Sequence, residues 1–596
     1  MNGFRDLNKN GKLDIYEDPE RPIGERVEDL LAQMTLEEKA GQMFQTFIGV
    51  DPDDEKLETA SGFSPFSPTH MVHGLKMTHL NLSGTPAPRQ MVAWSNRLQR
   101  LAEKERLGIP VTLSSDPRHA FSSNSAVGMT TPDFSQWPEP IGLAATRDAM
   151  LVREFADIAR QEYVAVGIRA ALHPMADLAT EPRWARINGT FGESAELAAE
   201  LVYQYVLGFQ GESIGPTSVA CMTKHFPGGG PQKDGMDPHF EDGKEQVYPG
   251  DNFDYHLIPF DAAFRAGTAM IMPYYGQPVG LPIEAVGFGF NKQVITSLLR
   301  EKYGFDGVVC TDWGLLTSME LDGRVIFAAR AWGVEHLNCS ERALKALDAG
   351  IDQFGGENCP EVIVDLVRSG KVSEARIDQS VRRLLRDKFR LGLFDNPYLN
   401  PDAAERTAGR ADFRAAGELA QRKSIVLLKN AAGHAHLPLQ PGVRLYVEGI
   451  DVKVASQYGE VVTDPAHADV AIVRLNTPYQ PGQGFLRDMF HQGDLDFKGE
   501  VKAHILTLLA QTPTIVVMHL DRPAVIPEIN ATCAALLGDF GANDGAVLDV
   551  VFGRFAPTGK LPFELPSSMD AVRAQFSDVP FDSADPLYRF GHGLSY

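Results

Sequence analysis

Short apolar runs in the first 360 residues each end at polar or aromatic side chains. The runs are GIPVTLSSD, GIRAALHPMAD, SVACMTKHF, TAMIMPYY and GFDGVVCTDWG. The residues at their ends are, in chain order, Asp116, Asp177, Lys224 with His225, Tyr274, and Asp312 with Trp313. Successive ends lie roughly 40 to 60 residues apart, which leaves room for a strand, a helix and two loops. The pattern predicts parallel strands with helices between them.

These strand ends also predict where the chemistry lies. In a β/α barrel, functional side chains gather at the carboxyl ends of the strands. Strands often end in Asp because this residue starts turns, so a single example would carry little weight. Five such ends in series favour a catalytic rim instead, and the sequence therefore predicts an enzyme.

Helical patterns complete the first predicted domain. ERVEDLLAQMTLEEKAGQMF has helical periodicity, and Thr35 with Glu38 forms a capping box for its second half. Strand and helix patterns then alternate to about Leu393, where the last helices are EVIVDLVRSG and EARIDQSVRRLLRDKFRLGLF. We therefore expect a (β/α)8-type TIM barrel over residues 21–394.

A change of pattern marks a second predicted domain. DNPYLNPDAAERTAGRADF is rich in Pro, Ala and charge and has no strand signal, which predicts a linker over residues 395–415. Afterwards IVLLKN, VRLYVEG, DVAIVRLN, TIVVMHLD and CAALLGDF alternate with helical segments. This alternation predicts a smaller α/β sandwich domain over residues 416–596, with a mostly parallel sheet.

Composition narrows the class of partner. The chain is 43% hydrophobic and 22% charged, with a net charge of −22. A field of this sign opposes binding to nucleic acid or to an anionic membrane and suits a neutral small-molecule substrate.

No stretch has the apolar length of a membrane span, and no signal peptide precedes MNGFRDLNKNG. We expect a cytoplasmic protein, with a periplasmic or extracellular location open if the start has been trimmed.

The cysteines predict neither a disulfide framework nor a zinc site. There are five of them, they are scattered, and no C-x-x-C motif occurs. Their positions are Cys221, Cys310, Cys339, Cys359 and Cys533. No cofactor is expected for catalysis.

The N-terminal segment over residues 1–20 fits the calcium-loop pattern D-x-N-x-N-G-x5-E. Gly11 would make the sharp turn of such a loop. The predicted ligands are Asp6, Asn8, Asn10, the Lys12 carbonyl, Asp14 through water, and Glu17. Only one copy is present and no clear helix precedes it, so a plain Asx-rich turn is the alternative. A structural Ca²⁺ would fix the N-terminus and would take no part in catalysis.

Three local motifs suit carbohydrate chemistry. KHFPGGG joins a strand end to a glycine loop that can turn both Lys224 and His225 toward the hydroxyls of a ligand. The run PRWAR places arginines on both sides of a tryptophan, which supplies charged donors and an aromatic platform. Asp312, next to Trp313, combines a carboxylate with a ring that can stack on a sugar, as attack at an anomeric carbon requires.

With KHFPGGG, PRWAR, GFDGVVCTDWG, TGKLPFELP and DPLYRFGHGLSY in this order, the chain resembles the family-3 glycoside hydrolases, mainly β-glucosidases. The resemblance covers nearly the whole chain. It implies a TIM barrel followed by an α/β sandwich, and retaining hydrolysis of terminal β-linked sugars. It also implies that Asp312 is the nucleophile. The residues it implies for sugar binding are Asp116, Arg186, Lys224, His225, Tyr274 and Trp313.

One departure from the family pattern concerns the acid/base. Relatives usually carry a glutamate in G-E-x-P-Y just after a strand of the second domain, but here Asn476 and Gln480 occupy this region. The neighbouring loop GFLRDMFHQGDLDF offers other proton donors, of which we predict Asp488. The remaining candidates in this loop are His491, Asp494 and Asp496.

Three functions are compatible with this sequence. The first is a retaining exo-acting β-glycosidase, most simply a β-glucosidase. The second is a sugar-binding protein derived from such an enzyme, although a binder would not need a nucleophile at Asp312. The third is a phosphorylase or transglycosidase, because a missing carboxylate near the leaving group would lessen the repulsion of phosphate. The sequence leaves the sugar, the linkage and the oligomeric state open.

Overall fold

A computed structural model describes residues 4–122, 127–321, 324–433, 435–484 and 486–596. The larger domain is a barrel of eight parallel strands in the spatial order β12-β1-β2-β3-β4-β5-β7-β9. These strands are β1 (Phe44–Ile48), β2 (His79–Leu82), β3 (Thr112–Ser115), β4 (Ile168–Ala171), β5 (Ala220–Phe226), β7 (Met270–Pro273), β9 (Val308–Val309) and β12 (Phe354–Gly355). A parallel bridge between Cys310 and Gln353 joins β9 to β12 and closes the ring. The predicted TIM barrel is therefore confirmed.

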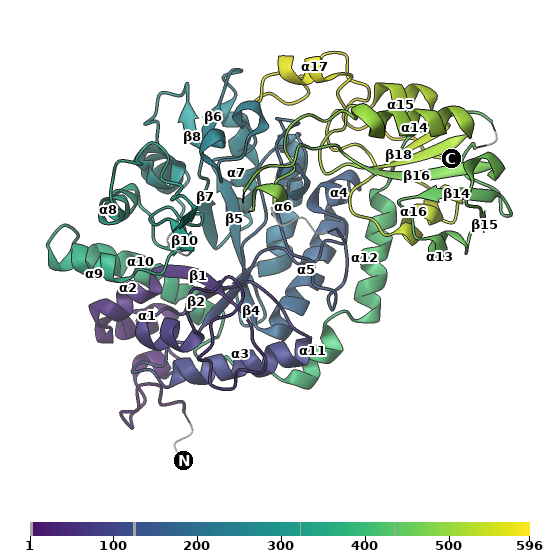
Figure 1. Ribbon diagram of the computed structural model, residues 1–596. Coiled ribbons are helices and arrows are strands. Elements are labelled where there is room, and N and C mark those ends of the chain that lie inside the picture. The colour runs from purple at the N-terminus through teal and green to yellow at the C-terminus, as the bar shows by residue number, and fades with distance from the viewer. Residues whose placement is uncertain (1–3, 123–126, 322–323, 434, 485) are drawn as a thin grey trace.

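Helices surround this ring in alternation with the strands (Figure 1). They are α1 (Ile23–Gln33), α2 (Leu36–Gln42), α3 (Pro88–Glu103), α4 (Pro140–Ala145), α5 (Ala149–Val166), α6 (Ala195–Gln210), α7 (Ile258–Arg265), η8 (Gln293–Lys302), α8 (Cys339–Ala349), α9 (Glu361–Arg368) and α10 (Glu374–Arg390). Side-chain caps and glycines mark the ends of such helices, as α5 illustrates. The Asp148 side chain accepts a hydrogen bond from the Leu151 N–H at the start of α5, and Gly167 ends this helix with φ +96°. The strand after it, β4, begins at the next residue.

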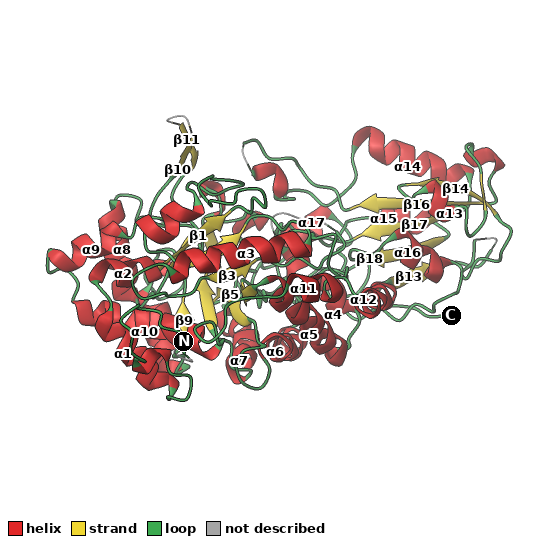
Figure 2. Ribbon diagram, turned by 90° about the horizontal axis from the view of Figure 1, so that it is seen from below, coloured by secondary structure: helices red, strands yellow, loops and turns green. Residues whose placement is uncertain are grey.

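Short paired strands lie outside the barrel ring. They are β6 (Glu245–Val247) with β8 (Gln277–Val279), and β10 (Met319–Leu321) with β11 (Arg324–Phe327). Figure 2 shows the β10–β11 hairpin standing out from the barrel. Because β10 begins soon after Asp312, the hairpin belongs to the loop that follows the proposed catalytic strand.

A buried lysine closes the amino end of the barrel. Lys388 lies on α10 with 1% of its surface exposed. Its Nζ donates hydrogen bonds to the Thr78 carbonyl at 3.1 Å, the Pro110 carbonyl at 2.9 Å and the Thr112 hydroxyl at 2.8 Å. Burial lowers the pKa of Lys388 well below its ordinary value. This end lies opposite the strand ends that carry the candidate site, so we assign Lys388 to stability.

Replacing Lys388 tests this assignment. Lys388→Ala leaves the Pro110 carbonyl without its donor, removes one of the donors to the Thr78 carbonyl and opens a cavity, and we expect it to lower the free energy of unfolding by about 3–5 kcal/mol. Lys388→Met fills most of the volume but donates nothing, so its cost is expected to be smaller, about 1–3 kcal/mol. Urea titration followed by circular dichroism measures both. Equal midpoints for Lys388→Ala and the unchanged protein would contradict the assignment.

The second domain contains a six-stranded sheet in the order β13-β18-β17-β16-β14-β15. Its strands are β13 (Val426–Asn430), β14 (Arg444–Glu448), β15 (Glu460–Val461), β16 (Val470–Asn476), β17 (Thr514–His519) and β18 (Ala535–Asp539). All neighbouring pairs are parallel except β13 with β18. The mostly parallel sheet is thus confirmed.

Helices cover both faces of this sheet (Figure 2). They are α13 (Val452–Ala455), α14 (Gly499–Gln511), α15 (Pro527–Thr532) and α16 (Asp544–Val551). The last helix, α17 (Met569–Ala574), lies away from the sheet and packs on Leu495 and Val525 instead. Alternate strand residues face opposite sides. Val516 packs into the core shared with α14, α15 and the barrel, whereas Val517 packs with α16. This arrangement confirms the predicted α/β sandwich.

The segment predicted as a linker is largely helical. It contains α11 (Pro401–Thr407) and the start of α12 (Ala411–Ser424), which runs from the barrel to the second domain (Figure 1).

The C-terminal segment returns to the barrel. The buried Glu193 carboxylate accepts hydrogen bonds from the Glu564 N–H at 2.6 Å and the Phe581 N–H at 2.7 Å. The two domains therefore share an extensive contact.

Candidate active site

Asp312 follows strand β9 and is 7% exposed. Its Oδ1 accepts a hydrogen bond from the Trp313 N–H at 2.8 Å, which fixes the orientation of the carboxylate. Among the described residues, none forms a hydrogen bond with the buried Oδ2. The His225 Nε2 lies 3.8 Å from this second oxygen. The backbone thus holds Oδ1 of Asp312, whereas Oδ2 is available to interact or react with a ligand.

The His225 imidazole lies beside Asp312 and is oriented from both sides. Its Nδ1 donates to Asp177 Oδ2 at 2.7 Å, and Arg186 Nη1 donates to its Nε2 at 3.1 Å. Burial, together with the charge of Arg186, lowers the pKa of His225 well below its ordinary value. The ring is therefore neutral, with its proton on Nδ1. Burial raises the pKa of Asp177 to about 6.

Lys224 and Asp116 form a second pair on the rim. Lys224 Nζ lies 3.0 Å from Asp116 Oδ1, and Asn81 Nδ2 donates to Asp116 Oδ2 at 3.3 Å. Burial alone would raise the pKa of Asp116, but the charge of Lys224 lowers it overall. The two side chains thus form an ion pair at the rim, and such groups can also hydrogen-bond with sugar hydroxyls.

The aromatic side chains surround the same rim. Tyr274 is fully buried, lies 4.4 Å from the His225 ring between centroids, and has Arg186 5.9 Å above its own ring. The Tyr275 hydroxyl donates to the Trp313 carbonyl at 2.8 Å. Trp313 is partly buried, and its ring lies 5.9 Å from that of Phe47. The structure therefore brings together all the sugar-binding residues that the sequence predicted in the barrel.

The structure adds a pair that the sequence analysis missed, Asp237 and His239. Asp237 Oδ2 accepts hydrogen bonds from Trp184 Nε1 and from the Tyr274 hydroxyl, both at 2.9 Å. Its Oδ1 lies 2.6 Å from His239 Nδ1. Burial alone would raise the pKa of Asp237, but His239 and Arg186 lower it well below its usual range. The pattern D-x-H soon after the glycine loop was the available signal for this pair.

A loop of the second domain, residues 477–497, reaches the barrel beside this pair. The Phe490 ring lies 4.9 Å from His239 and 5.2 Å from Phe240 between centroids. Arg487 pairs with Asp242 and lies 4.7 Å over the Phe240 ring. The loop thus folds over the barrel, which is the condition on which the predicted acid/base depends.

Within this loop, the candidate proton donors differ in environment. Asp488 lies on a short 3-10 turn, η10 (Arg487–Met489), and its side chain is exposed. His491 Nδ1 lies 2.5 Å from Asp521 Oδ2, and its ring stacks on Tyr479 at 4.0 Å. Asp494 and Asp496 both pair with Lys498. Asn476 and Gln480, which occupy the family's usual acid/base region, are exposed.

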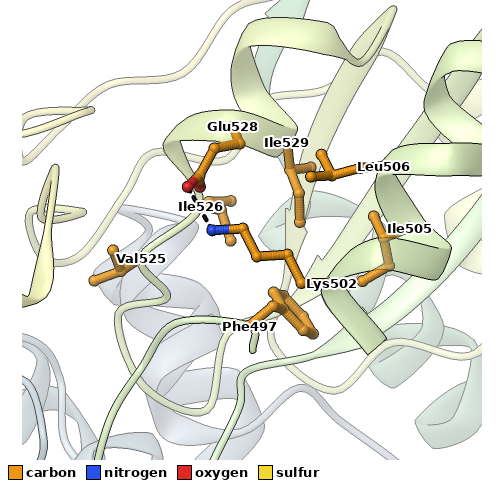
Figure 3. Close-up of a pocket in the computed structure, with 8 residues that line it drawn as sticks. All are labelled: Phe497, Lys502, Ile505, Leu506, Val525, Ile526, Glu528 and Ile529. Atoms are coloured by element: carbon orange, nitrogen blue, oxygen red, sulfur yellow. Dashed lines mark hydrogen bonds and ion pairs between the residues drawn. The ribbon is translucent and has the colours of Figure 1, made fainter. Parts of the chain in front are cut away.

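A separate pocket lies wholly within the second domain, between α14 and α15 (Figure 3). The pocket is small, and an ion pair between Lys502 and Glu528 at 2.5 Å spans it. The remaining lining residues are Phe497, Ile505, Leu506, Val525, Ile526 and Ile529. None of the barrel residues described above contributes to it, so we do not assign the reaction to this pocket.

Comparison with known proteins identifies the family. The sequence matches the glycosyl hydrolase family 3 N terminal domain over residues 35–386 and the glycosyl hydrolase family 3 C-terminal domain over residues 440–596. The chain belongs to glycosyl hydrolase family 3. It is thus a glycoside hydrolase, and the resemblance noted in the sequence is confirmed.

Relatives within this family extend over the whole chain. The chain is 52% identical to β-glucosidase C of Emericella nidulans, over 99% of its own length and 95% of that protein. It is 42% identical to the periplasmic β-glucosidase/β-xylosidase of Dickeya chrysanthemi, over 100% of its own length and 93% of that protein. These relatives establish a family-3 β-glycosidase.

Solved structures of two other glycosidases share the fold. A β-glucosidase from Erythrobacter marinus superposes with a TM-score of 0.78 at 22% identity, covering 98% of this chain and 84% of that one. A mutant exo-1,3/1,4-β-glucanase from a Pseudoalteromonas species gives a TM-score of 0.77 at 22% identity, covering 96% of this chain and 95% of that one. Both support the order of barrel and sandwich described above.

None of the described helices is long and apolar enough to cross a membrane.

The N-terminal loop has the turn geometry expected of a calcium loop. Gly11 has φ +76°, and Asp6 accepts hydrogen bonds from the Asn10 N–H at 3.0 Å and the Gly11 N–H at 2.9 Å. Asn8 and Asn10 both donate to Asp14 Oδ2. In the described part of the chain, no group of three or more His, Cys, Asp and Glu side chains is arranged to hold a metal. The predicted set also uses Asn side chains and a carbonyl, so a cation here stays a prediction.

Chelation tests the calcium prediction. If Asp6, Asn8, Asn10, Asp14 and Glu17 bind Ca²⁺ only in the folded state, a chelator lowers Tm and added Ca²⁺ restores it. Ca²⁺ at about 100 times its Kd contributes about 2.7 kcal/mol by this linkage. Asp6→Asn should reduce the response. Identical melting curves with and without chelator would leave the Asx-rich turn as the interpretation.

Proposed function

We propose that this protein is a retaining exo-acting β-glucosidase that removes terminal non-reducing β-D-glucosyl residues through a covalent glycosyl-enzyme on Asp312. The observation that carries the proposal is the buried Asp312 Oδ2, which makes no hydrogen bond within the described part of the chain. A carboxylate oxygen that is fixed by its neighbour and otherwise unoccupied is suited to attack at an anomeric carbon. The position of Asp312 at a barrel strand end supports the same role.

The surrounding charges support binding of a neutral sugar. The pair of Lys224 and Asp116 offers a donor and an acceptor at the rim, and Arg186 adds a second cation. His225 is neutral, so it does not neutralise the Asp312 carboxylate by ion pairing. Burial lowers the pKa of Arg186, but Tyr274, Asp237 and Asp312 raise it above its ordinary value, so this side chain stays charged. We infer that these groups hold the sugar hydroxyls while Asp312 attacks.

Asp488 is the proposed acid/base. It would protonate the glycosidic oxygen as the first bond breaks and later remove a proton from the attacking water. The loop that carries it is anchored at the barrel by Phe490 and Arg487. His239 is the competing donor, because its ring lies 4.7 Å from that of Tyr275 and is oriented by Asp237. Alanine variants of Asp488 and His239 separate the two candidates.

The proposed sugar is glucose because relatives over the full chain carry β-glucosidase names. The Dickeya relative is also named a β-xylosidase, so xylosides form the comparison substrate. Structures of the Listeria innocua β-glucosidase have been solved with glucose and, in a mutant form, with laminaribiose. Short β-linked glucosides are therefore the proposed natural class of substrate.

Hydrolysis of p-nitrophenyl β-glucoside and β-xyloside tests the function, and proton NMR tests the stereochemistry. We expect faster release from the glucoside and β-glucose as the first-formed product. Addition of phosphate separates the alternative reaction, because a phosphorylase would release glucose 1-phosphate. Binding of glucose with no turnover of either glycoside would instead support a sugar-binding protein.

A further inference from the structure

Arg522 is a fully buried arginine in the segment that follows β17, where the second domain meets the barrel. Its guanidinium donates hydrogen bonds to three backbone carbonyls. Nη2 donates to the Pro478 carbonyl at 2.6 Å, and Nη1 donates to the carbonyls of Gly493 and Arg183, each at 3.2 Å. Pro478 and Gly493 lie near the two ends of the loop over residues 477–497, whereas Arg183 belongs to the barrel. One side chain therefore joins both ends of this loop to the barrel.

Neighbouring contacts close the base of the same loop. Asp521, which precedes Arg522, is 5% exposed, and its Oδ2 lies 2.5 Å from His491 Nδ1. The Gln480 N–H donates to the Gln492 carbonyl at 2.8 Å and so pairs the two arms of the loop. The segment that follows β17 thus holds the loop at several points near its base.

The carbonyl that the guanidinium reaches on the barrel belongs to a fixed part of the candidate site. The Arg183 side chain donates to both carboxylate oxygens of Glu181, at 2.8 Å and 3.0 Å. The next residue, Trp184, is fully buried and donates from Nε1 to Asp237. The loop is therefore tied to a wall of the candidate site that has its own hydrogen bonds.

We propose that Arg522 is a positioning residue, which holds the loop over residues 477–497 where proton transfer to the leaving group requires it. This loop carries Asp488, the proposed acid/base, and also His491. Because Arg522 is fully buried behind the loop, it acts through the loop. The inference rests on the proposed function and on an acid/base in the second domain.

A guanidinium suits this role because its planar N–H groups point in several directions and can reach separate acceptors. Within the described part of the chain, Arg522 is the only donor to the carbonyls of Pro478, Gly493 and Arg183. Its loss would leave these acceptors unsatisfied and free the loop to shift. A displacement of about 1 Å at a reacting group can cost about 10²-fold in rate.

Hydrogen exchange of the full-length protein tests the anchoring without any substrate. Arg522→Met keeps much of the side-chain length and removes every donor. We expect the amide hydrogens of residues 477–497 to exchange several-fold faster in this variant than in the unchanged protein, with the strands β1 to β4 unaffected. Arg522→Lys keeps the charge and some of the donors, so its exchange should be intermediate.

Kinetics test the positioning role. Arg522→Met is expected to lower kcat/KM for cellobiose by about 10²-fold, because cellobiose has a poor leaving group that needs a well-placed acid. Glycosylation by a dinitrophenyl glucoside, which needs no proton, should stay within about threefold. Arg522→Lys should recover part of the loss with cellobiose.

Arg169 provides a matched control. It lies near the start of β4, is 7% exposed, and donates to the carbonyls of Pro216 at 2.8 Å, Leu391 at 2.9 Å and Ser218 at 3.2 Å. Arg169→Met should lower Tm, as Arg522→Met does, but should leave the ratio of the rates with the two substrates unchanged. This comparison separates positioning of the loop from a general loss of stability.

Three results would overturn the proposal. They are unchanged exchange of the loop in Arg522→Met, equal slowing of both substrates by this variant, and the same change of ratio in Arg169→Met. If the unchanged protein cleaves neither glucoside, the proposed function fails instead. The exchange measurement then decides by itself whether Arg522 holds the loop.

Discussion

Asp312→Asn is expected to reduce turnover of an aryl β-glucoside by about 10⁴-fold or more, because an amide is a very poor nucleophile at an anomeric carbon. Asparagine has the same shape as aspartate, and its carbonyl can still accept the hydrogen bond from the Trp313 N–H. We therefore expect little change in Tm or in glucose affinity. Initial rates, thermal melting and calorimetric titration with glucose measure the three quantities.

Two further variants make this result specific to Asp312. Asp261→Asn changes an exposed carboxylate of α7 that pairs with Arg265 of the same helix, and it should retain activity within a few-fold. Asp312→Gly makes room for an external nucleophile, and azide should restore release of a good leaving group, with an α-glycosyl azide as the product. Activity of Asp312→Asn within tenfold of the unchanged protein would show that another residue is the nucleophile.

The sequence predicted the barrel and most of its rim because strand ends are a local signal. An apolar run that stops at Asp116 or Asp312 can be read without knowledge of any distant residue, and parallel strands bring such ends to one edge. The same reasoning correctly placed the second sheet. The family resemblance then added Arg186, which lies beyond a strand end and which periodicity alone would not have singled out.

Residues whose role depends on long-range contact were beyond this reasoning. Asp237 and His239 lie in an irregular loop, and their importance follows only from the hydrogen bonds of Asp237 with Trp184 and Tyr274. Lys388 is similar, because a lysine on an amphipathic helix is expected to face solvent until its three buried acceptors are seen. The helices in the predicted linker were missed because Pro and Ala content was weighed as loop composition, although Pro is favourable in the first turn of a helix such as α11.

Asp488→Ala is expected to slow cleavage of cellobiose by about 10²–10⁴-fold and to leave glycosylation by a dinitrophenyl glucoside nearly unchanged. A poor leaving group needs a proton as its bond breaks, whereas dinitrophenolate departs without one. The same variant should accumulate glycosyl-enzyme, since water then lacks its base. Azide attacks without a base and should relieve this stall. Pre-steady-state release of dinitrophenolate, with and without azide, measures both steps.

Variants of the neighbouring residues show which side chain is the acid/base. Asp494→Ala and Asp496→Ala remove carboxylates that are already paired with Lys498, so neither should respond to azide. Gln480→Ala should likewise show no response to azide, because the amide of Gln480 cannot give up a proton at neutral pH. His239→Ala and His491→Ala test the two histidines that are oriented by a carboxylate. If Asp488→Ala slows both substrates equally and ignores azide, Asp488 is not the acid/base. A response of His239→Ala would then place the proton donor on the barrel, and one of His491→Ala would keep it on the second domain.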